Sequence, residues 1–252
     1  MPNHLLYMIS KSFRFKLIFK QASLAIGMVV ALVSPSIADV VEIKSFGHSS
    51  FLVRGGGHSI LLNPFKAVGC AQGLREPNVI PDIVLASSEL ADEGYWKKEG
   101  VFFVKPGSYL IRGLNLEGFS AAHDHMGGRR FGYGTFWQWT QGGVNFVHLG
   151  GIAGNIDSQD KLLLGRPDVL FIGVGGGSKV FSAKKAASIV NELNPRIVIP
   201  VQYNRGEKPP NCDQTDIQPF LDVTQNFEKR KIGRNLVVPN KLPEKTVIHL
   251  MQ

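Results

Sequence analysis

The apolar runs of this sequence change their pattern between its two halves, and this change restricts the fold more than any other feature. In the first half, short β-rich runs are separated by glycines, and Gly55–Gly57 gives a clear hairpin signal. In the second half, the apolar strand 169–174 precedes a helix with Ser182 at its N-cap, and another apolar strand follows. Strands first, and then strands alternating with helices, predict an α/β protein whose sheets are covered by helices.

The same reading gives the expected elements, with an irregular loop at 63–81. The predicted strands are 41–46, 50–53, 58–62, 83–86, 101–104, 109–111, 114–119, 135–140, 144–148, 169–174 and 196–201. The predicted helices are 182–193 and 216–229. Because no repeat, low-complexity stretch or linker divides residues 39–252, we expect them to form a single domain.

Residues 1–38 have the layout of a secretory signal peptide. A basic segment without acidic residues comes first, and the apolar run 22–33 follows. Small residues stand at Ser36 and Ala38, the positions that precede a cut before Asp39. The alternative is an uncleaved membrane anchor, for which the apolar run is short. We expect an exported protein, in a periplasm, a thylakoid lumen or another extracytoplasmic compartment, that meets a membrane only through this segment if it stays uncleaved.

The distribution of charge gives little support to nucleic-acid binding. The chain carries 28 Lys and Arg residues against 20 Asp and Glu, a formal net charge of +8. Residues 1–38 hold 4 of these cations and no anion, so about half of the net charge leaves with them. No basic cluster is interleaved with aromatic residues in the remainder. The expected partner is therefore an unidentified ligand or a protein, and not a nucleic acid.

Several short motifs follow the predicted strands in a fixed order. They are Phe46–Phe51 (FGHSSF), Ile60–Phe65 (ILLNPF), Ser87–Glu93 (SSELADE), Ala121–His125 (AAHDH), His148–Gly151 (HLGG) and Ile199–Tyr203 (IPVQY). This order resembles the metallo-β-lactamase superfamily, and within it the branch of the ascorbate-6-phosphate lactonase-like zinc hydrolases. The resemblance covers about residues 41–203. It implies an αββα four-layer sandwich with the active site along one edge, between the two sheets.

The resemblance also implies a set of metal ligands, and most of them are missing. The family's seven ligand positions fall on Ser88, Leu90, Asp92, Glu93, His123, Gly151 and Gln202. Only Asp92 and His123 keep the family's residue type, and the supporting Asp-Pro pair has become Asn63-Pro64. Catalytic zinc needs about three protein ligands and an open position for the water that it activates. We therefore expect neither a zinc-hydroxide mechanism nor a bound metal cofactor.

A changed cation site is one alternative. Asp92, Glu93 and Gln202 supply oxygen donors, with His123 as a further ligand candidate. Oxygen ligands suit Ca²⁺, Mg²⁺ or Mn²⁺ better than zinc. The alternative cofactor is therefore a single divalent cation.

A metal-free hydrolase is the other alternative, with Ser87 or Ser88 as nucleophile and His123 or His125 as base. Neither serine has the flanking glycines of a nucleophile elbow. If the segment 123–125 is extended, both histidines point to one face. Otherwise one is a buried, hydrogen-bonded histidine and the other lies exposed in a loop.

Four further residues have structural interpretations. An isolated pair of cysteines, Cys70 and Cys212, is a disulfide candidate in an oxidising compartment. The resemblance adds that their two loops lie at the same edge of the sandwich, and so implies a bridge across the mouth of the old active site. His48 and His148 are interpreted as hydrogen-bonded structural residues inside the sandwich.

Two functional hypotheses follow from the sequence. The favoured one is a non-catalytic protein, exported and of metallo-β-lactamase fold, that binds a ligand or a protein partner. The other is a hydrolase acting through an altered site, with Ser88, Asp92 and His123 as catalytic candidates. The cleft expected under either hypothesis is lined by Ser88, Glu89, Asp92, Glu93, His123, His125, Gln202 and Tyr203.

Overall fold

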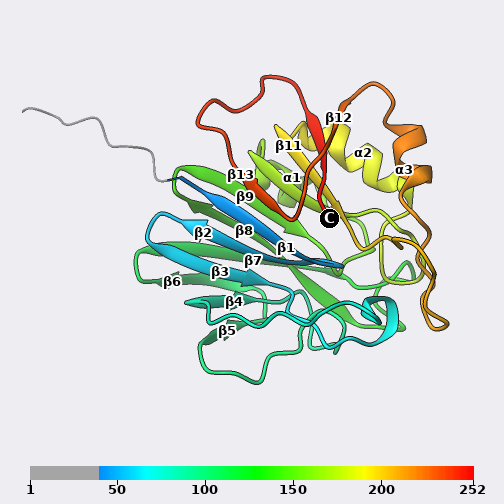
Figure 1. Ribbon diagram of the computed structural model, residues 1–252, viewed down its shortest axis with the longest axis horizontal. Coiled ribbons are helices and arrows are strands. Elements are labelled where there is room, and N and C mark those ends of the chain that lie inside the picture. The colour runs from blue at the N-terminus through cyan, green and yellow to red at the C-terminus, as the bar shows by residue number, and fades with distance from the viewer. Residues whose placement is uncertain (1–39) are drawn as a thin grey trace, which may run out of the picture. The chain divides into compact units, whose positions relative to one another are not determined.

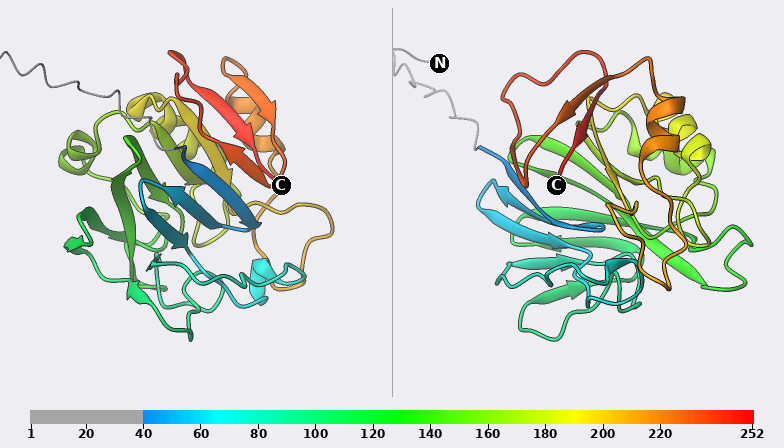
Figure 2. Two further views of the ribbon diagram at one scale, coloured as in Figure 1. Left: turned by 60° about the vertical axis from the view of Figure 1, so that its left-hand side comes forward. Right: turned by 45° about the vertical axis from the view of Figure 1, so that its right-hand side comes forward.

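The computed structural model describes residues 40–252, so the predicted signal peptide at 1–38 lies outside the described residues. Two β-sheets stack face to face in this part of the chain (Figures 1 and 2). Within residues 40–252, every helix is too short or too polar to cross a membrane.

The first sheet has six strands. The glycine-linked hairpins predicted from the sequence lie near its centre. Its strands are β1 (Glu42–Gly47), β2 (Ser50–Gly55), β3 (His58–Leu62), β4 (Ile83–Leu85), β5 (Val101–Phe103) and β13 (Asn235–Val237). Their order is β13-β1-β2-β3-β4-β5. The β2–β3 turn needs glycine, because Gly56 and Gly57 have φ of 56° and 75°.

The second sheet has eight strands and changes from antiparallel to parallel pairing along its width. Its order is β12-β14-β11-β10-β9-β8-β7-β6. The four strands β6 to β9 pair antiparallel, and β9, β10, β11, β14 and β12 pair parallel. The strands are β6 (Gly107–Ile111), β7 (Leu114–Ala122), β8 (Tyr133–Gln141), β9 (Val144–Leu149), β10 (Val169–Gly173), β11 (Ile197–Val201), β12 (Glu228–Lys231) and β14 (Val247–Leu250).

A hydrophobic core joins the two sheets. Phe51 of β2 meets Phe171 of β10 at a ring-centroid distance of 4.7 Å, and both side chains are fully buried. Trp137 of β8 is also buried, and its indole N–H donates to the carbonyl of Ala86 at 2.9 Å. Each buried aromatic side chain contributes about 1.5–3 kcal/mol through the hydrophobic effect. This core holds the edges of the two sheets in fixed relative positions.

Helices cover the outer face of the second sheet (Figure 1). They are α1 (Ser158–Leu164), α2 (Ala183–Leu193) and α3 (Gln218–Val223). The α2 helix begins as predicted, with Ser182 Oγ accepting from the Lys185 amide at 3.3 Å. In the described residues, loops that carry Val79 and Trp96 pack on the outer face of the first sheet, and the 3-10 turn η1 (Gly69–Ala71) lies between β3 and β4. The expected sandwich is thus confirmed, with one outer layer formed by irregular segments.

The predicted helix over 216–229 is confirmed only in its first part, as α3, and is wrong beyond Val223. The α3 helix ends at Val223, and residues 228–231 form β12 in parallel pairing with β14. Thr224 Oγ1 donates to the Phe220 carbonyl at 2.6 Å, and a turn brings the Phe227 amide to the Thr224 carbonyl at 3.1 Å. The charged sequence of β12 suits an exposed edge strand, where charge discourages pairing with another chain.

Candidate functional site

The positions that the resemblance assigns to metal ligands lie on loops that follow four strands. Ser88 and Glu93 follow β4, His123 follows β7, Gly151 follows β9, and Gln202 follows β11. The side chains of Ser88, His123 and Gln202 contact the carboxyl group of Glu93. The Gly151 amide donates to the side chain of Gln202. We call these five residues the Glu93 cluster.

A tight turn aims Glu93 inward. The Leu90 carbonyl accepts from the Glu93 amide at 3.1 Å and from the Gly94 amide at 2.8 Å. A Cβ on Gly94 would lie 1.7 Å from the Ser88 carbonyl oxygen, so this turn closes only with glycine at that position. The sequence analysis did not use Gly94, although a glycine directly after Glu93 was a signal for a turn.

Hydrogen bonds and an ion pair surround both carboxylate oxygens. Oε1 lies 2.7 Å from His123 Nε2 and accepts from Ser88 Oγ at 3.0 Å. Oε2 accepts from Gln202 Nε2 at 3.1 Å, and Gln202 Oε1 accepts from the Gly151 amide at 3.0 Å. The side chains of Glu93 and His123 are 1% and 0% exposed, so this is a closed, buried cluster. His123 Nε2 lies within ion-pair distance of Oε1, although its ring N–H is poorly aligned for a hydrogen bond.

The surroundings keep Glu93 ionised. Burial is the largest influence and acts to raise its pKa. The contact with His123 and the charges of His123, Lys179 and His48 act in the opposite direction and prevail, lowering the pKa of Glu93 to about 2. The cluster is therefore built around an internal carboxylate anion.

Gly151 has no room for a side chain. A Cβ at this position would lie 2.5 Å from Glu93 Oε2 and 2.5 Å from Ser87 Cβ. Its φ of 75° is also one that glycine adopts most easily. The Glu93 carboxyl group thus fills the space into which a side chain from position 151 would project.

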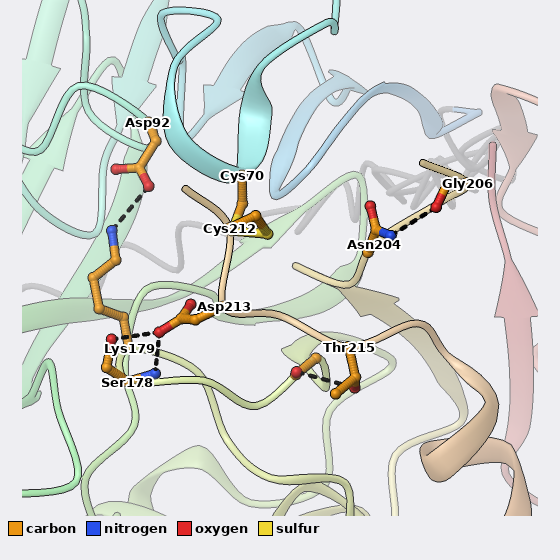
Figure 3. The surroundings of a disulfide bond; sticks show 10 residues. Cys70, Asp92, Ser178, Lys179, Asn204, Gly206, Cys212, Asp213 and Thr215 are labelled. Atoms are coloured by element: carbon orange, nitrogen blue, oxygen red, sulfur yellow. Dashed lines mark hydrogen bonds and ion pairs between the residues drawn. A yellow bond between two sulfur atoms is a disulfide. The ribbon is translucent and has the colours of Figure 1, made fainter. Parts of the chain in front are cut away.

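Asp92 is directed away from the Glu93 cluster. Its Oδ2 accepts from Lys179 Nζ at 2.8 Å, and Figure 3 shows this lysine reaching from the loop after β10. The expected convergence of Asp92 and Glu93 is therefore not found, because an ammonium group holds the first carboxylate. Sequence reasoning missed Lys179, which sits in a glycine-rich loop without a motif.

Ser87 and Ser88 have partners other than a catalytic base. Ser87 Oγ donates to the Gly150 carbonyl, and Asn63 Oδ1 accepts from the Ser87 amide at 2.8 Å. Ser88 Oγ and His123 Nε2 both contact Oε1 of Glu93. The carboxylate therefore lies between the serine and the histidine.

The segment after β7 is a loop and not an extended strand. Asp124 accepts from four backbone amides of this loop, including those of Met126 at 2.8 Å and Phe131 at 2.7 Å. His123 is buried, whereas His125 is exposed and has its Nε2 2.9 Å from the Gly177 carbonyl oxygen. The shared face proposed for an extended segment is wrong, and the second interpretation, one buried and one exposed histidine, is confirmed.

The predicted disulfide is confirmed. Cys70 in η1 and Cys212 in the loop after β11 are joined, with their Cα atoms 4.5 Å apart (Figure 3). Next to it, Asp213 accepts from the Ser178 amide at 2.7 Å and from the Ser178 hydroxyl at 2.6 Å. The loop after β11 is thus tied both to the first sheet and to the loop after β10.

A cavity of about 280 Å³ opens beside this disulfide. His48 lies in its wall and is 7% exposed, so the prediction of a buried residue is confirmed, whereas its predicted side-chain hydrogen bond is not found among residues 40–252. A φ of 53° turns its backbone, and its carbonyl accepts from the Gln202 amide at 3.1 Å. Tyr203 lines the same cavity, whereas Glu89 lies apart on the surface, 3.3 Å from Lys105.

The sequence profile of the β-lactamase superfamily domain matches residues 42–202, well over half of the chain. The chain belongs to the metallo-β-lactamase superfamily. A UPF0173 metal-dependent hydrolase of Lysinibacillus sphaericus (strain C3-41) is 27% identical over 222 residues, which cover 75% of this chain and 94% of the relative. The match does not test the ascorbate-6-phosphate lactonase branch, which stays a prediction.

Solved structures of the superfamily share the fold. A Thermotoga maritima protein assigned to its Zn-dependent hydrolases has a TM-score of 0.67 and 23% identity, covering 84% of this chain and 100% of its own. Igni18, a metallo hydrolase from Ignicoccus hospitalis KIN4/I, has a TM-score of 0.51 and 17% identity, covering 74% and 91%. These likenesses establish the architecture and carry no information on activity.

The side chains present do not fit the metal of the superfamily. Among residues 40–252, no three His, Cys, Asp or Glu side chains converge as a metal site. At the superfamily's own positions, Asp92 pairs with Lys179 and Glu93 with His123. A divalent cation here would have to displace the Lys179 ammonium group or break the buried contact of Glu93 with His123. The donors that remain are too few for catalytic zinc.

His148 predicts a loss of stability in mild acid. Its Nε2 lies 3.2 Å from the Ser49 carbonyl oxygen, as expected for a structural histidine, and burial lowers its pKa from 6.5 to about 4. Between these values the unfolded state binds more protons, so the free energy of unfolding falls as the pH falls. The contribution of His148 is about 3 kcal/mol at most over this window.

Urea denaturation of His148→Gln between pH 7 and pH 4 checks this expectation. The variant should lose less stability than the wild-type protein as the pH falls. The matched control His125→Gln, at an exposed loop position, should keep the wild-type dependence. An unchanged pH dependence in His148→Gln would show that another group is responsible.

Proposed function

We propose that this protein is a non-catalytic member of the metallo-β-lactamase superfamily that binds a ligand or a protein partner. The binding site would be formed by the loops that carry the superfamily's metal-ligand positions. The observation that carries the proposal is the Glu93 cluster. Its carboxylate lies 2.7 Å from His123 Nε2 and accepts a hydrogen bond from Gln202, and all three residues stand at superfamily ligand positions. A buried cluster that satisfies its own charges offers no open coordination position for a reactive water.

The two hydrolase alternatives have less support. A hard cation would need the carboxylate of Asp92, which holds Lys179 at 2.8 Å. A Ser88–His123 pair would need direct contact and access for a substrate, but both residues contact Glu93, and His123 is fully buried. We keep them as outcomes of the experiment below.

Export is part of the proposal. The Cys70–Cys212 disulfide supports it, because such bonds persist in oxidising compartments and are rare in the cytosol. The leader-like pattern of residues 1–38 also supports export.

Metal content tests the proposal directly. The mature protein, purified from the exported fraction without chelators or a His tag, is expected to hold less than about a tenth of an equivalent of any metal, because too few ligands are free. Elemental mass spectrometry measures this before and after soaking in zinc and manganese. The Lysinibacillus relative, purified in parallel, is the positive control. A stoichiometric metal that Asp92→Ala removes would contradict the proposal and favour the cation-dependent hydrolase.

A further inference from the structure

The cavity beside the disulfide has a chemistry of its own. It is enclosed by the end of β1, the η1 loop, the loop after β11 and the residue before β13. Its lining includes none of the five residues of the Glu93 cluster. Because the two sites share no lining residue, a ligand in the cavity needs no contact with the buried carboxylate.

One part of the wall is apolar and aromatic. Phe46, Leu74 and Tyr203 line the cavity together with the sulfur-bearing Cys70. A volume of about 280 Å³ is near the lower end for a small-molecule site, whose walls are typically hydrophobic and aromatic with a few placed polar groups. This wall suits a flat or compact apolar body.

The lining also holds cationic groups. Arg205 lies over the Tyr203 ring, with its guanidinium carbon 4.7 Å from the ring centroid, and Arg234 is a second guanidinium in the lining. Neither forms an ion pair with a carboxylate of residues 40–252. Glu207 and the last residue, Gln252, also lie in the lining, so the two unpaired guanidinium groups, and not a net positive charge, are what a carboxylate would meet. Guanidinium groups match planar carboxylates through paired hydrogen bonds.

A fixed frame completes the wall, and His48 belongs to it. His48 and Gln202 both hold left-handed backbone conformations, with φ of 53° and 52°, and are joined by their backbone hydrogen bond. The disulfide fixes the facing loops. Such a preformed wall lowers the entropic cost of binding.

We propose that this cavity binds a small organic carboxylate with an aromatic or other apolar body, the carboxylate meeting Arg205 and Arg234 and the body lying against Phe46, Leu74 and Tyr203. This cavity proposal rests on the proposed function, because the carboxylate would be the ligand of the proposed binding protein. An inorganic anion would leave the apolar wall uncovered, and a neutral molecule would leave the two guanidinium groups without a carboxylate.

Calorimetric titration of the full mature protein with matched probes tests the site. The probe is 3-phenylpropionate, and its uncharged amide and inorganic phosphate are the comparison ligands. We expect saturable binding of the acid, with affinity at least about tenfold lower for the amide and for phosphate. Arg205→Gln and Arg234→Gln should each weaken acid binding by about tenfold, whereas the exposed loop control Arg129→Gln should bind as the wild type does.

Three results would overturn the proposal. They are equal affinity for acid and amide, phosphate binding as tight as the acid, and no saturable binding of the acid to the folded protein. Metal analysis of the same samples separates this site from the proposed function. A metal-loaded protein that binds the acid would refute the non-catalytic role alone, and a metal-free protein that fails to bind it would refute the cavity site alone.

Discussion

Glu93→Ala is expected to lower the free energy of unfolding by about 3–5 kcal/mol, the usual cost of breaking a buried ion pair. The substitution removes the anion that His123, Ser88 and Gln202 share. Both ring nitrogens of His123 are buried and have no other hydrogen-bond partner in the described residues. The remaining polar groups would therefore lose their partner without gaining water. Urea denaturation at neutral pH measures the change.

Glu89→Ala is the matched control, because it makes the same change four positions earlier in the same loop. The Glu89 side chain is 70% exposed and its ion pair with Lys105 is on the surface. Exposed pairs contribute about 0–1 kcal/mol, so this variant should unfold almost as the wild type does. If the two alanine variants had the same free energy of unfolding, the Glu93 cluster would not stabilise the protein as proposed.

Gly151→Ala is expected to cost about 2–4 kcal/mol, the sum of two effects. A left-handed backbone costs a non-glycine residue about 1 kcal/mol or more, and overpacking of a filled core costs about 1–3 kcal/mol. The overpacking arises because the new methyl group would lie 2.5 Å from a Glu93 oxygen and from Ser87 Cβ. Urea denaturation again provides the measurement.

Gly127→Ala separates the two effects. Gly127 has a φ of 70°, close to the 75° of Gly151, but a Cβ there would have nothing within 4 Å. It should therefore show the backbone cost alone. In a Glu93→Ala background the added cost of Gly151→Ala should shrink, since the clashing oxygen is gone. Additive effects would mean that the carboxyl group does not fill the space beside position 151.

The sequence predicted most of the sandwich because its strands have strong local signals. Val169–Val174 is a continuous apolar run and became a central strand, and Ser182 capped its helix as expected. The C-terminal strand β12 has no such signal. Glu228–Lys231 is entirely charged, and it is a strand only because β14 pairs with it. Pairing of this kind depends on tertiary context, which local propensity does not contain.

At the candidate site, the sequence predicted which residues were missing but not what replaced their interactions. The substitutions at Ser88, Gly151 and Gln202 were visible as departures from a motif. That Glu93 would accept from Ser88 and Gln202 and fill the space beside Gly151 depended on the turn at Gly94. The pairing of Asp92 with Lys179 joins loops that are 87 residues apart, so spacing along the chain could not predict it.

The Cys70–Cys212 bridge also has a consequence for biosynthesis. Its cysteines are 142 residues apart, so the bond cannot form until most of the chain has been synthesised and has reached an oxidising compartment. Until then the η1 loop carries a lone thiol, and nothing covalent holds the loop after β11. The wall of the cavity that includes Cys70 is therefore among the last parts of the molecule to be fixed, and a chain retained in a reducing compartment would keep that wall open.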